Sequence, residues 1–142
     1  MNNTTTISIV LITLLVAGGL IGFEQYKVSK AAAEEDAAMN APSIYLPLAQ
    51  CLKEKGAAFY GAEWCPHCKA QKKAFASAAK ELPYVECAIP DGAGGYKNEM
   101  VQACVDAKVE SFPTWTFADG SRLSGEVPMA TLAEKSGCAL PQ

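Results

Sequence analysis

The feature that most constrains this chain is the cysteine pair in Cys65-Pro66-His67-Cys68, which follows a short apolar run. Residues 57–61 (AAFYG) predict a buried strand. Pro66 is well tolerated as the first residue of a helix, because the N–H that it lacks has no partner there. The pair therefore lies at the junction between a strand and a helix. At a helix start, unpaired N–H groups and the helix dipole favour a thiolate over a thiol.

This position gives the two cysteines different expected roles. Cys65 is the expected nucleophile, and Cys68, one helical turn further on, can attack a mixed disulfide from within and release the substrate. His67 is the single histidine of the chain, and it can donate a hydrogen bond or positive charge to the Cys65 thiolate. Pro66 is expected to tune the pair as well. Trp64 is expected to line the site; plain packing for Trp64 and a solvated position for His67 are the alternatives.

Size, charge and cysteine content limit the classes of protein that remain. A chain of 142 residues permits one compact domain together with a tail or an anchor. Twelve Lys and Arg against 15 Asp and Glu give a net charge of -3, without the basic surface that nucleic acids require. Six cysteines fit an oxidising compartment. We therefore expect no nucleic-acid partner and a domain outside the cytoplasm.

The N-terminal residues predict a membrane anchor. Residues 7–23 contain no charged side chain, and their number is at the short end of what spans a bilayer. Residues 1–6 form a short tail without a basic side chain, which favours an uncleaved anchor over a signal peptide. Lys27 and Lys30 oppose an extracytoplasmic C-terminus under the positive-inside rule, but the cysteine content carries more weight. We expect a single-pass membrane protein whose C-terminal domain lies on the periplasmic or cell-surface side.

Behind the anchor, the sequence divides into a spacer and one domain. Residues 24–42 are rich in Ala and charge and predict a spacer, and the globular pattern covers residues 43–142. The expected helices span residues 46–56, 66–82, 97–108 and 129–136, and the expected strands span residues 57–61, 84–88, 114–118 and 122–124. This order is that of an α/β thioredoxin fold, in which helices flank a central mixed sheet. Two parallel strands are followed by an antiparallel pair.

The residues YGAEWCPHC and SFPTW, with AQCLKEKG and GSRLSGEVP, resemble the thioredoxin-like domain associated with bacterial vitamin K epoxide reductase homologues. The resemblance covers nearly all of residues 43–142, and WCPHC is also similar to the DsbA-type oxidants. It implies a domain that oxidises secreted proteins with free thiols. It also implies reoxidation by an integral-membrane vitamin K epoxide reductase homologue linked to quinone. No cofactor is then expected on the domain itself, since quinone acts only through the membrane partner.

The same resemblance implies roles for residues outside the cysteine pair. Pro113 matches a cis-proline that faces the active pair, although it could simply begin a strand. Phe112 matches the residue whose backbone pairs with an extended substrate. Aligned on the cysteine motif, Phe59 takes the place of the buried acid of ordinary thioredoxins. The usual base for Cys68 is therefore absent, and Glu63 offers indirect help or is a plain surface carboxylate.

The remaining four cysteines are expected to form structural disulfides. The resemblance implies a bridge between Cys87 and Cys104, from a strand to the following helix. We expect a second bridge, between Cys51 and Cys138, to join the ends of the domain. Spacing alone leaves many connectivities open.

Other functions remain open at this point. A reductase or isomerase kept reduced by another membrane protein would use the same motif, because the motif does not fix the direction of electron flow. A metal-binding module is a further alternative, since such a pair also begins zinc sites. A closed zinc site needs two more suitably spaced ligands, so we expect no metal. A non-catalytic interaction module is the last alternative.

Overall fold

The computed structural model describes residues 26–27, 29–30, 33–34, 37 and 40–142. The tail and anchor expected at residues 1–6 and 7–23, and part of the spacer expected at 24–42, lie outside the described residues. Within the described part, no helix combines the length and apolar character needed to cross a membrane. Contacts divide the chain into residues 1–37 and 38–142. The fold below is that of the second unit.

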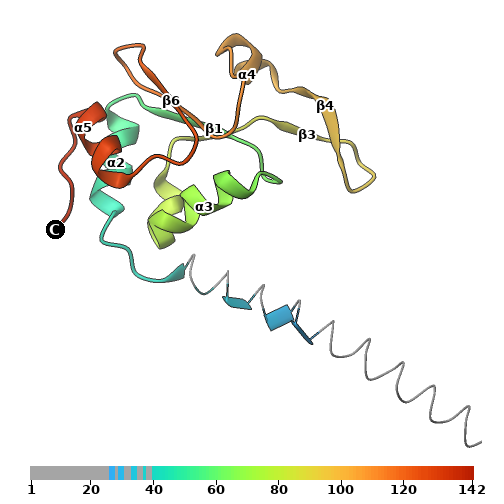
Figure 1. The fold of residues 1–142 in the computed structure, drawn as a ribbon, viewed down its shortest axis with the longest axis horizontal. Coiled ribbons are helices and arrows are strands. Elements are labelled where there is room, and N and C mark those ends of the chain that lie inside the picture. The colour runs from blue at the N-terminus through green and yellow to red at the C-terminus, as the bar shows by residue number, and fades with distance from the viewer. Residues whose placement is uncertain (1–25, 28, 31–32, 35–36, 38–39) are drawn as a thin grey trace, which may run out of the picture. The chain divides into compact units, whose positions relative to one another are not determined.

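A four-stranded mixed sheet with the strand order β2-β1-β5-β6 forms the centre of the domain (Figure 1). Its strands are β1 (Ala58–Gly61), β2 (Tyr84–Glu86), β5 (Thr114–Thr116) and β6 (Arg122–Ser124). β1 and β2 run parallel, β5 runs antiparallel to β1, and β6 runs antiparallel to β5. This arrangement confirms the predicted parallel pair followed by an antiparallel pair. Together with the helices around it, the sheet fits a thioredoxin-like fold.

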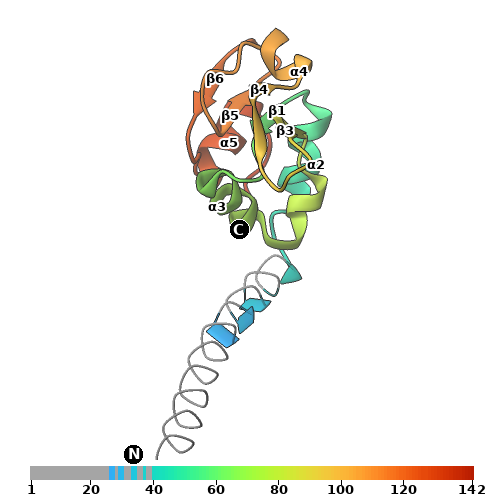
Figure 2. The same ribbon diagram turned by 90° about the vertical axis from the view of Figure 1, so that its right-hand side faces the viewer.

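Four α-helices accompany the sheet, and Figures 1 and 2 show them from two sides. They are α2 (Leu46–Glu54), α3 (Pro66–Phe75), α4 (Gln102–Asp106) and α5 (Met129–Ser136). The bounds of α5 match the prediction, and Gly137 ends this helix in the left-handed conformation, with φ 69°. α2 packs against α5.

The helix expected over residues 66–82 is shorter than predicted. α3 ends at Phe75, and Ala76 has a positive φ of 47°, which the regular helix does not allow. A 3₁₀ helix, Ala76–Glu81, follows. Here the N–H of Ser77 donates to the carbonyl of Ala41, 3.2 Å away, instead of to a carbonyl of α3. This tertiary contact replaces the helical bond that periodicity predicted.

The prediction of a helix over residues 97–108 was wrong for the first part of this range. Tyr96–Met100 forms strand β4, which pairs antiparallel with β3 (Ala88–Pro90) in a separate two-stranded sheet. Only Gln102–Asp106 is helical, as α4. The turn between the strands is closed by Asp91, whose Oδ1 accepts the backbone N–H groups of residues 93 and 95. A closed hairpin satisfies the backbone of residues 96–100 by pairing with β3, so this segment does not need helical hydrogen bonds.

The main core lies directly against the helix that carries the cysteine pair. Its largest fully buried members include Leu48, Leu52, Phe59, Phe75, Trp115 and Leu132. The Phe59 ring stacks on Trp115 with 4.6 Å between ring centroids, and it meets the Tyr84 ring edge-on at 5.1 Å. Phe59, at the position where thioredoxins carry an acid, is therefore part of an aromatic stack.

Two disulfides join elements of the domain. Cys51 in α2 is bonded to Cys138, which follows α5, with an S–S distance of 2.09 Å. Cys87, directly after β2, is bonded to Cys104 in α4, at 2.01 Å. These are the two pairings given above from the resemblance and from the ends of the domain. The thiols of the Cys65–Cys68 pair are free.

Candidate active site

The cysteine pair lies at the first turn of α3. Cys65 is the N-cap residue in an extended conformation, with φ -78° and ψ 120°, and Pro66 is the first helical residue. Cys65 keeps an exposed fraction of 4%, against 1% for Cys68. Both thiols are thus largely covered, and Cys65 has more access to solvent than Cys68. An attacking and a resolving cysteine need this order of access.

Cys68 is held as a thiol. Burial raises the pKa of Cys68 to about 12, while a backbone hydrogen bond from Ala62 lowers it in part. The neighbouring Cys65 raises the pKa further, and the charge of Lys72 lowers it. At neutral pH, Cys68 can therefore act as a nucleophile only if its proton is removed during the reaction.

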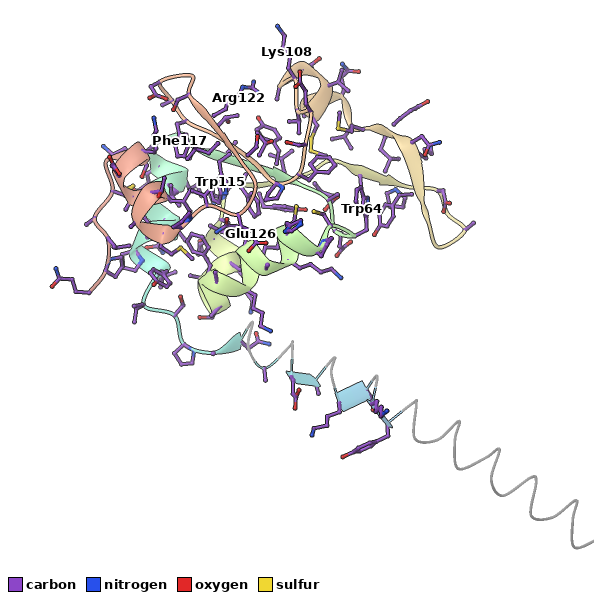
Figure 3. The ribbon with its side chains drawn as sticks, viewed as in Figure 1. Trp64, Lys108, Trp115, Phe117, Arg122 and Glu126 are labelled. Atoms are coloured by element: carbon purple, nitrogen blue, oxygen red, sulfur yellow. A yellow bond between two sulfur atoms is a disulfide. The ribbon has the colours of Figure 1, made fainter. Side chains whose placement is uncertain are left out.

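The segment with the cis-proline faces the pair. The Phe112–Pro113 peptide bond is cis, as the resemblance implied, and the Pro113 side chain is fully buried. The Cys65 thiol donates to the carbonyl oxygen of Phe112, with 3.8 Å between the sulfur and the oxygen. Trp64, which is labelled in Figure 3, is 53% exposed. Its ring meets the Phe112 ring edge-on, with 6.0 Å between ring centroids. The structure thus brings together four residues that the sequence analysis had named separately.

His67 has a partner that the sequence analysis missed. Its Nδ1 lies 2.7 Å from Oε1 of Glu126, and both side chains are exposed. Glu126 stands 59 residues further along the chain, and no motif marks it. Its neighbour Val127 exchanges two backbone hydrogen bonds with the buried side chain of Gln71 in α3, at 2.6 and 3.1 Å. These two bonds hold the segment that contains Glu126 beside α3. In the sequence, the polar Gln71 on the apolar face of α3 was the one sign of such a contact.

A second group that the sequence analysis missed lies beneath the pair. Lys72 Nζ lies 3.3 Å from the centroid of the Tyr84 ring. The Tyr84 hydroxyl donates to Oε2 of Glu86, at 2.7 Å. The other carboxylate oxygen, Oε1, accepts the backbone N–H groups of Glu63 and Ala88, at 3.1 and 2.9 Å. Tyr84 and Glu86 stand two residues apart on β2, a spacing that places both on one face of a strand.

Gly61, at the end of β1, lies between Cys68 and the Tyr84 side chain. A Cβ at Gly61 would lie 2.8 Å from Cys68 Sγ, 2.9 Å from Tyr84 Cε2 and 3.2 Å from the Tyr84 hydroxyl oxygen. A side chain at this position would collide with both the sulfur and the phenol, so only glycine fits between them. Burial, and then the hydrogen bond to Glu86, raises the pKa of Tyr84, so the phenol keeps its proton at neutral pH.

No arrangement for a metal ion is present in the part of the chain that the structure describes. There, no group of three or more His, Cys, Asp or Glu side chains is placed to hold one. The four cysteines outside the pair are taken up by disulfides. Their sulfurs are thus unavailable as thiolate ligands.

The chain is similar to a curated protein with a named activity. No family model matches the chain. Over 100 residues, the chain is 50% identical to the thiol-disulfide oxidoreductase LTO1 of Arabidopsis thaliana; the match covers 68% of this chain and 25% of that protein. The chain therefore spans about a quarter of the length of this relative. The similarity supports protein thiol–disulfide oxidoreductase chemistry in this domain.

Proposed function

We propose that this protein is a protein thiol–disulfide oxidoreductase in which Cys65 and Cys68 alternate between dithiol and disulfide. The observation that carries the proposal is the pair of free thiols at the start of α3, next to the Phe112–Pro113 segment. The identity with a relative named for this activity supports it. Trp64 and the Phe112 backbone then receive the substrate, and Pro66 and His67 tune the pair.

The proposal includes a direction and a partner. The domain oxidises the thiols of secreted proteins, and an integral-membrane, quinone-linked vitamin K epoxide reductase homologue reoxidises it. The WCPHC motif and its flanking segments support this direction through their resemblance to such domains. The two structural disulfides support an oxidising compartment. The uncharged residues 7–23 support an anchor that holds both proteins in one membrane and raises their effective concentration.

The reaction is a pair of exchanges in each direction. A substrate thiolate attacks Cys65 Sγ of the disulfide, and Cys68 leaves as the reduced member of the pair. A second substrate thiol then displaces Cys65, so that the substrate is oxidised and the pair is reduced by two electrons. For reoxidation, the Cys65 thiolate attacks a disulfide of the partner. Cys68 then loses its proton and attacks Cys65 Sγ, and the partner leaves as a thiolate.

Trapping of the mixed disulfide tests this proposal. In cells that carry Cys68→Ser, the intermediate on Cys65 is not resolved, so non-reducing gels should show covalent adducts. The matched variant Cys65→Ser should show none, because it lacks the attacking sulfur. Equal adducts in the two variants would exclude Cys65 as the nucleophile. Mass spectrometry should identify a quinone-linked membrane enzyme among the adducts; soluble proteins alone would leave the chemistry standing and remove the partner.

The direction of electron flow needs a measurement of its own. An oxidant rests largely as the disulfide between turnovers, whereas a reductase or isomerase rests as the dithiol. Rapid acid quenching of intact cells, followed by alkylation of free thiols, reports the state of the Cys65–Cys68 pair. We expect a mostly oxidised pair. A mostly reduced pair would favour the reductase or isomerase.

A further inference from the structure

The resolving step needs a proton acceptor that the aromatic core does not provide. The position of the buried acid of thioredoxins is taken by Phe59, whose ring is stacked on Trp115. Cys68 nevertheless has to give up its proton when it attacks Cys65, and burial opposes the loss of that proton. The inference below rests on the proposed function and concerns this single step.

On the sheet side, the phenol of Tyr84 lies near Cys68 and interacts with it electrostatically. The Cys68 sulfur and the Tyr84 oxygen both lie within 3.2 Å of the point where a Cβ on Gly61 would stand. The two distances from that point, 2.8 Å to the sulfur and 3.2 Å to the oxygen, place the two atoms at most 6.0 Å apart, a gap that one bridging water molecule can span. The phenol in turn donates to Glu86 Oε2 at 2.7 Å, and Glu86 is held by two backbone N–H groups on its other oxygen. With one water molecule between the sulfur and the phenol, a polar path would lead from Cys68 to a fixed carboxylate.

We propose that Tyr84 and Glu86 form a proton relay that takes the proton of Cys68 during resolution, with Lys72 as the cation that balances the charge. Cys68 Sγ bonds to Cys65 Sγ, the bond from Cys65 to the bound protein breaks, and its electron pair leaves with the departing sulfur. Through one bridging water molecule, the Cys68 proton passes to the Tyr84 oxygen while the phenol's own proton passes to Glu86 Oε2. Glu86 later returns the proton to solvent. No free phenolate forms.

The charges around Cys68 agree with this path. The titratable groups that interact with it are Cys65 and Lys72, at the start and within α3, and Tyr84 on β2. The carboxylates of Glu86 and Glu63 act on Lys72 and Tyr84. Lys72 stands one helical turn after Cys68 and is fixed over the Tyr84 ring. Its charge favours the Cys68 thiolate as the proton leaves, and the charge of Glu86 favours the protonated form of Lys72.

A two-step assay separates the resolving step from the first attack. Reduced protein is mixed rapidly with an aromatic disulfide whose thiolate is coloured. Attack by Cys65 releases the first coloured thiolate, and attack by Cys68 on the mixed disulfide releases the second. The two phases are read in one trace, so each variant carries its own internal control.

Tyr84→Phe and Glu86→Gln should each slow the second phase by roughly 100-fold at neutral pH and leave the first phase unchanged. Phe keeps the ring beneath Lys72, and Gln keeps an oxygen for the two backbone N–H groups. In the wild type, the second phase should change little from about pH 6 to about pH 9, because an internal base takes the proton. In Glu86→Gln it should rise about tenfold for each pH unit, as hydroxide replaces the missing base.

Glu63→Gln is the matched control, since it removes the same charge from a neighbouring side chain that makes no hydrogen bond to Tyr84. Both of its phases should stay within about twofold of the wild type. An equal slowing in Glu63→Gln and Glu86→Gln would overturn the relay, because loss of charge alone would then explain it. An unchanged second phase in Tyr84→Phe would overturn it as well, even if Glu86→Gln failed to fold. Absence of both phases in the wild type would instead contradict the proposed function.

Discussion

At the scale of single residues, the contact between His67 and Glu126 gives the active site a tunable element. Nδ1 donates to the carboxylate, so the ring is held in one orientation, with Nε2 left for other contacts. We expect His67→Ala to make the pair less oxidising. Glu126→Ala should act in the same direction but more weakly, because the contact is exposed. We expect it to change the equilibrium constant for exchange with glutathione by about two- to fivefold.

Equilibration with glutathione, read by thiol alkylation, measures this constant. The double variant is the control: if Glu126 acts through His67, then Glu126→Ala has no further effect once His67 is Ala. An effect of equal size in both backgrounds would mean that the carboxylate acts on the cysteines directly.

Some of these residues could be predicted from the sequence and others could not. Cys65, Cys68 and the cis bond before Pro113 belong to short motifs, whose local geometry follows from their own residues. Glu126 could not be found in this way, because its role depends on a loop brought to α3 by tertiary contacts. The pairing of Tyr84 with Glu86 is local, but its nearness to Cys68 depends on how β2 lies beside β1.

At the scale of elements, the β3–β4 hairpin is the part of the fold that the sequence pattern misrepresented. Met100, Val101, Cys104 and Val105 have helical spacing, yet Met100 lies in β4 and only the last two lie in α4. These four residues are thus divided between a strand, the N-cap residue Val101 and a short helix, because the turn at residues 91–95 places residues 96–100 in a hairpin. α5 has no such competitor, and its bounds were predicted correctly.

Asp91 is the residue on which this hairpin depends. Asp91→Ala removes the acceptor for two backbone N–H groups in the turn, so amide hydrogen exchange in Tyr96–Met100 should accelerate. The same bonds lower the pKa of Asp91, so acidification through that pKa should loosen the turn in the same way. Asp91→Asn keeps an oxygen acceptor and should behave like the wild type near neutral pH. Exchange that is unaffected in Asp91→Ala would show that the strands alone define the turn.

At the scale of the whole molecule, the bridge between Cys51 and Cys138 closes almost the entire domain into one loop, over a sequence separation of 87. A cross-link over a long loop restricts the unfolded chain most strongly. The double variant Cys51→Ala and Cys138→Ala should therefore lower the free energy of unfolding by about 2–4 kcal/mol. Denaturant unfolding in the absence of reductant measures this change.

The same variant should keep both phases of the disulfide assay, because the bridge lies on α2 and after α5 and contributes no atom to the active pair. Loss of the redox reaction in a folded variant would contradict this separation of roles.

The order of strands, and with it the overall topology, could be predicted because apolar runs and turn residues specify it. The bounds of the elements within residues 84–108 could not be predicted from the sequence. They depend on the pairing of β3 with β4 and on the Cys87–Cys104 disulfide, which are both tertiary contacts.

The burial of Cys87 and Cys104 has a consequence for how the protein behaves as a redox couple. Both residues are fully buried, and exchange requires a thiolate to approach a disulfide sulfur directly. Neither the protein's own active thiols nor those of its clients can reach this bridge without local unfolding. The bridge between Cys87 and Cys104 therefore takes no part in thiol–disulfide exchange while the domain is folded. In graded glutathione buffers, the folded domain should then behave as a single two-electron couple.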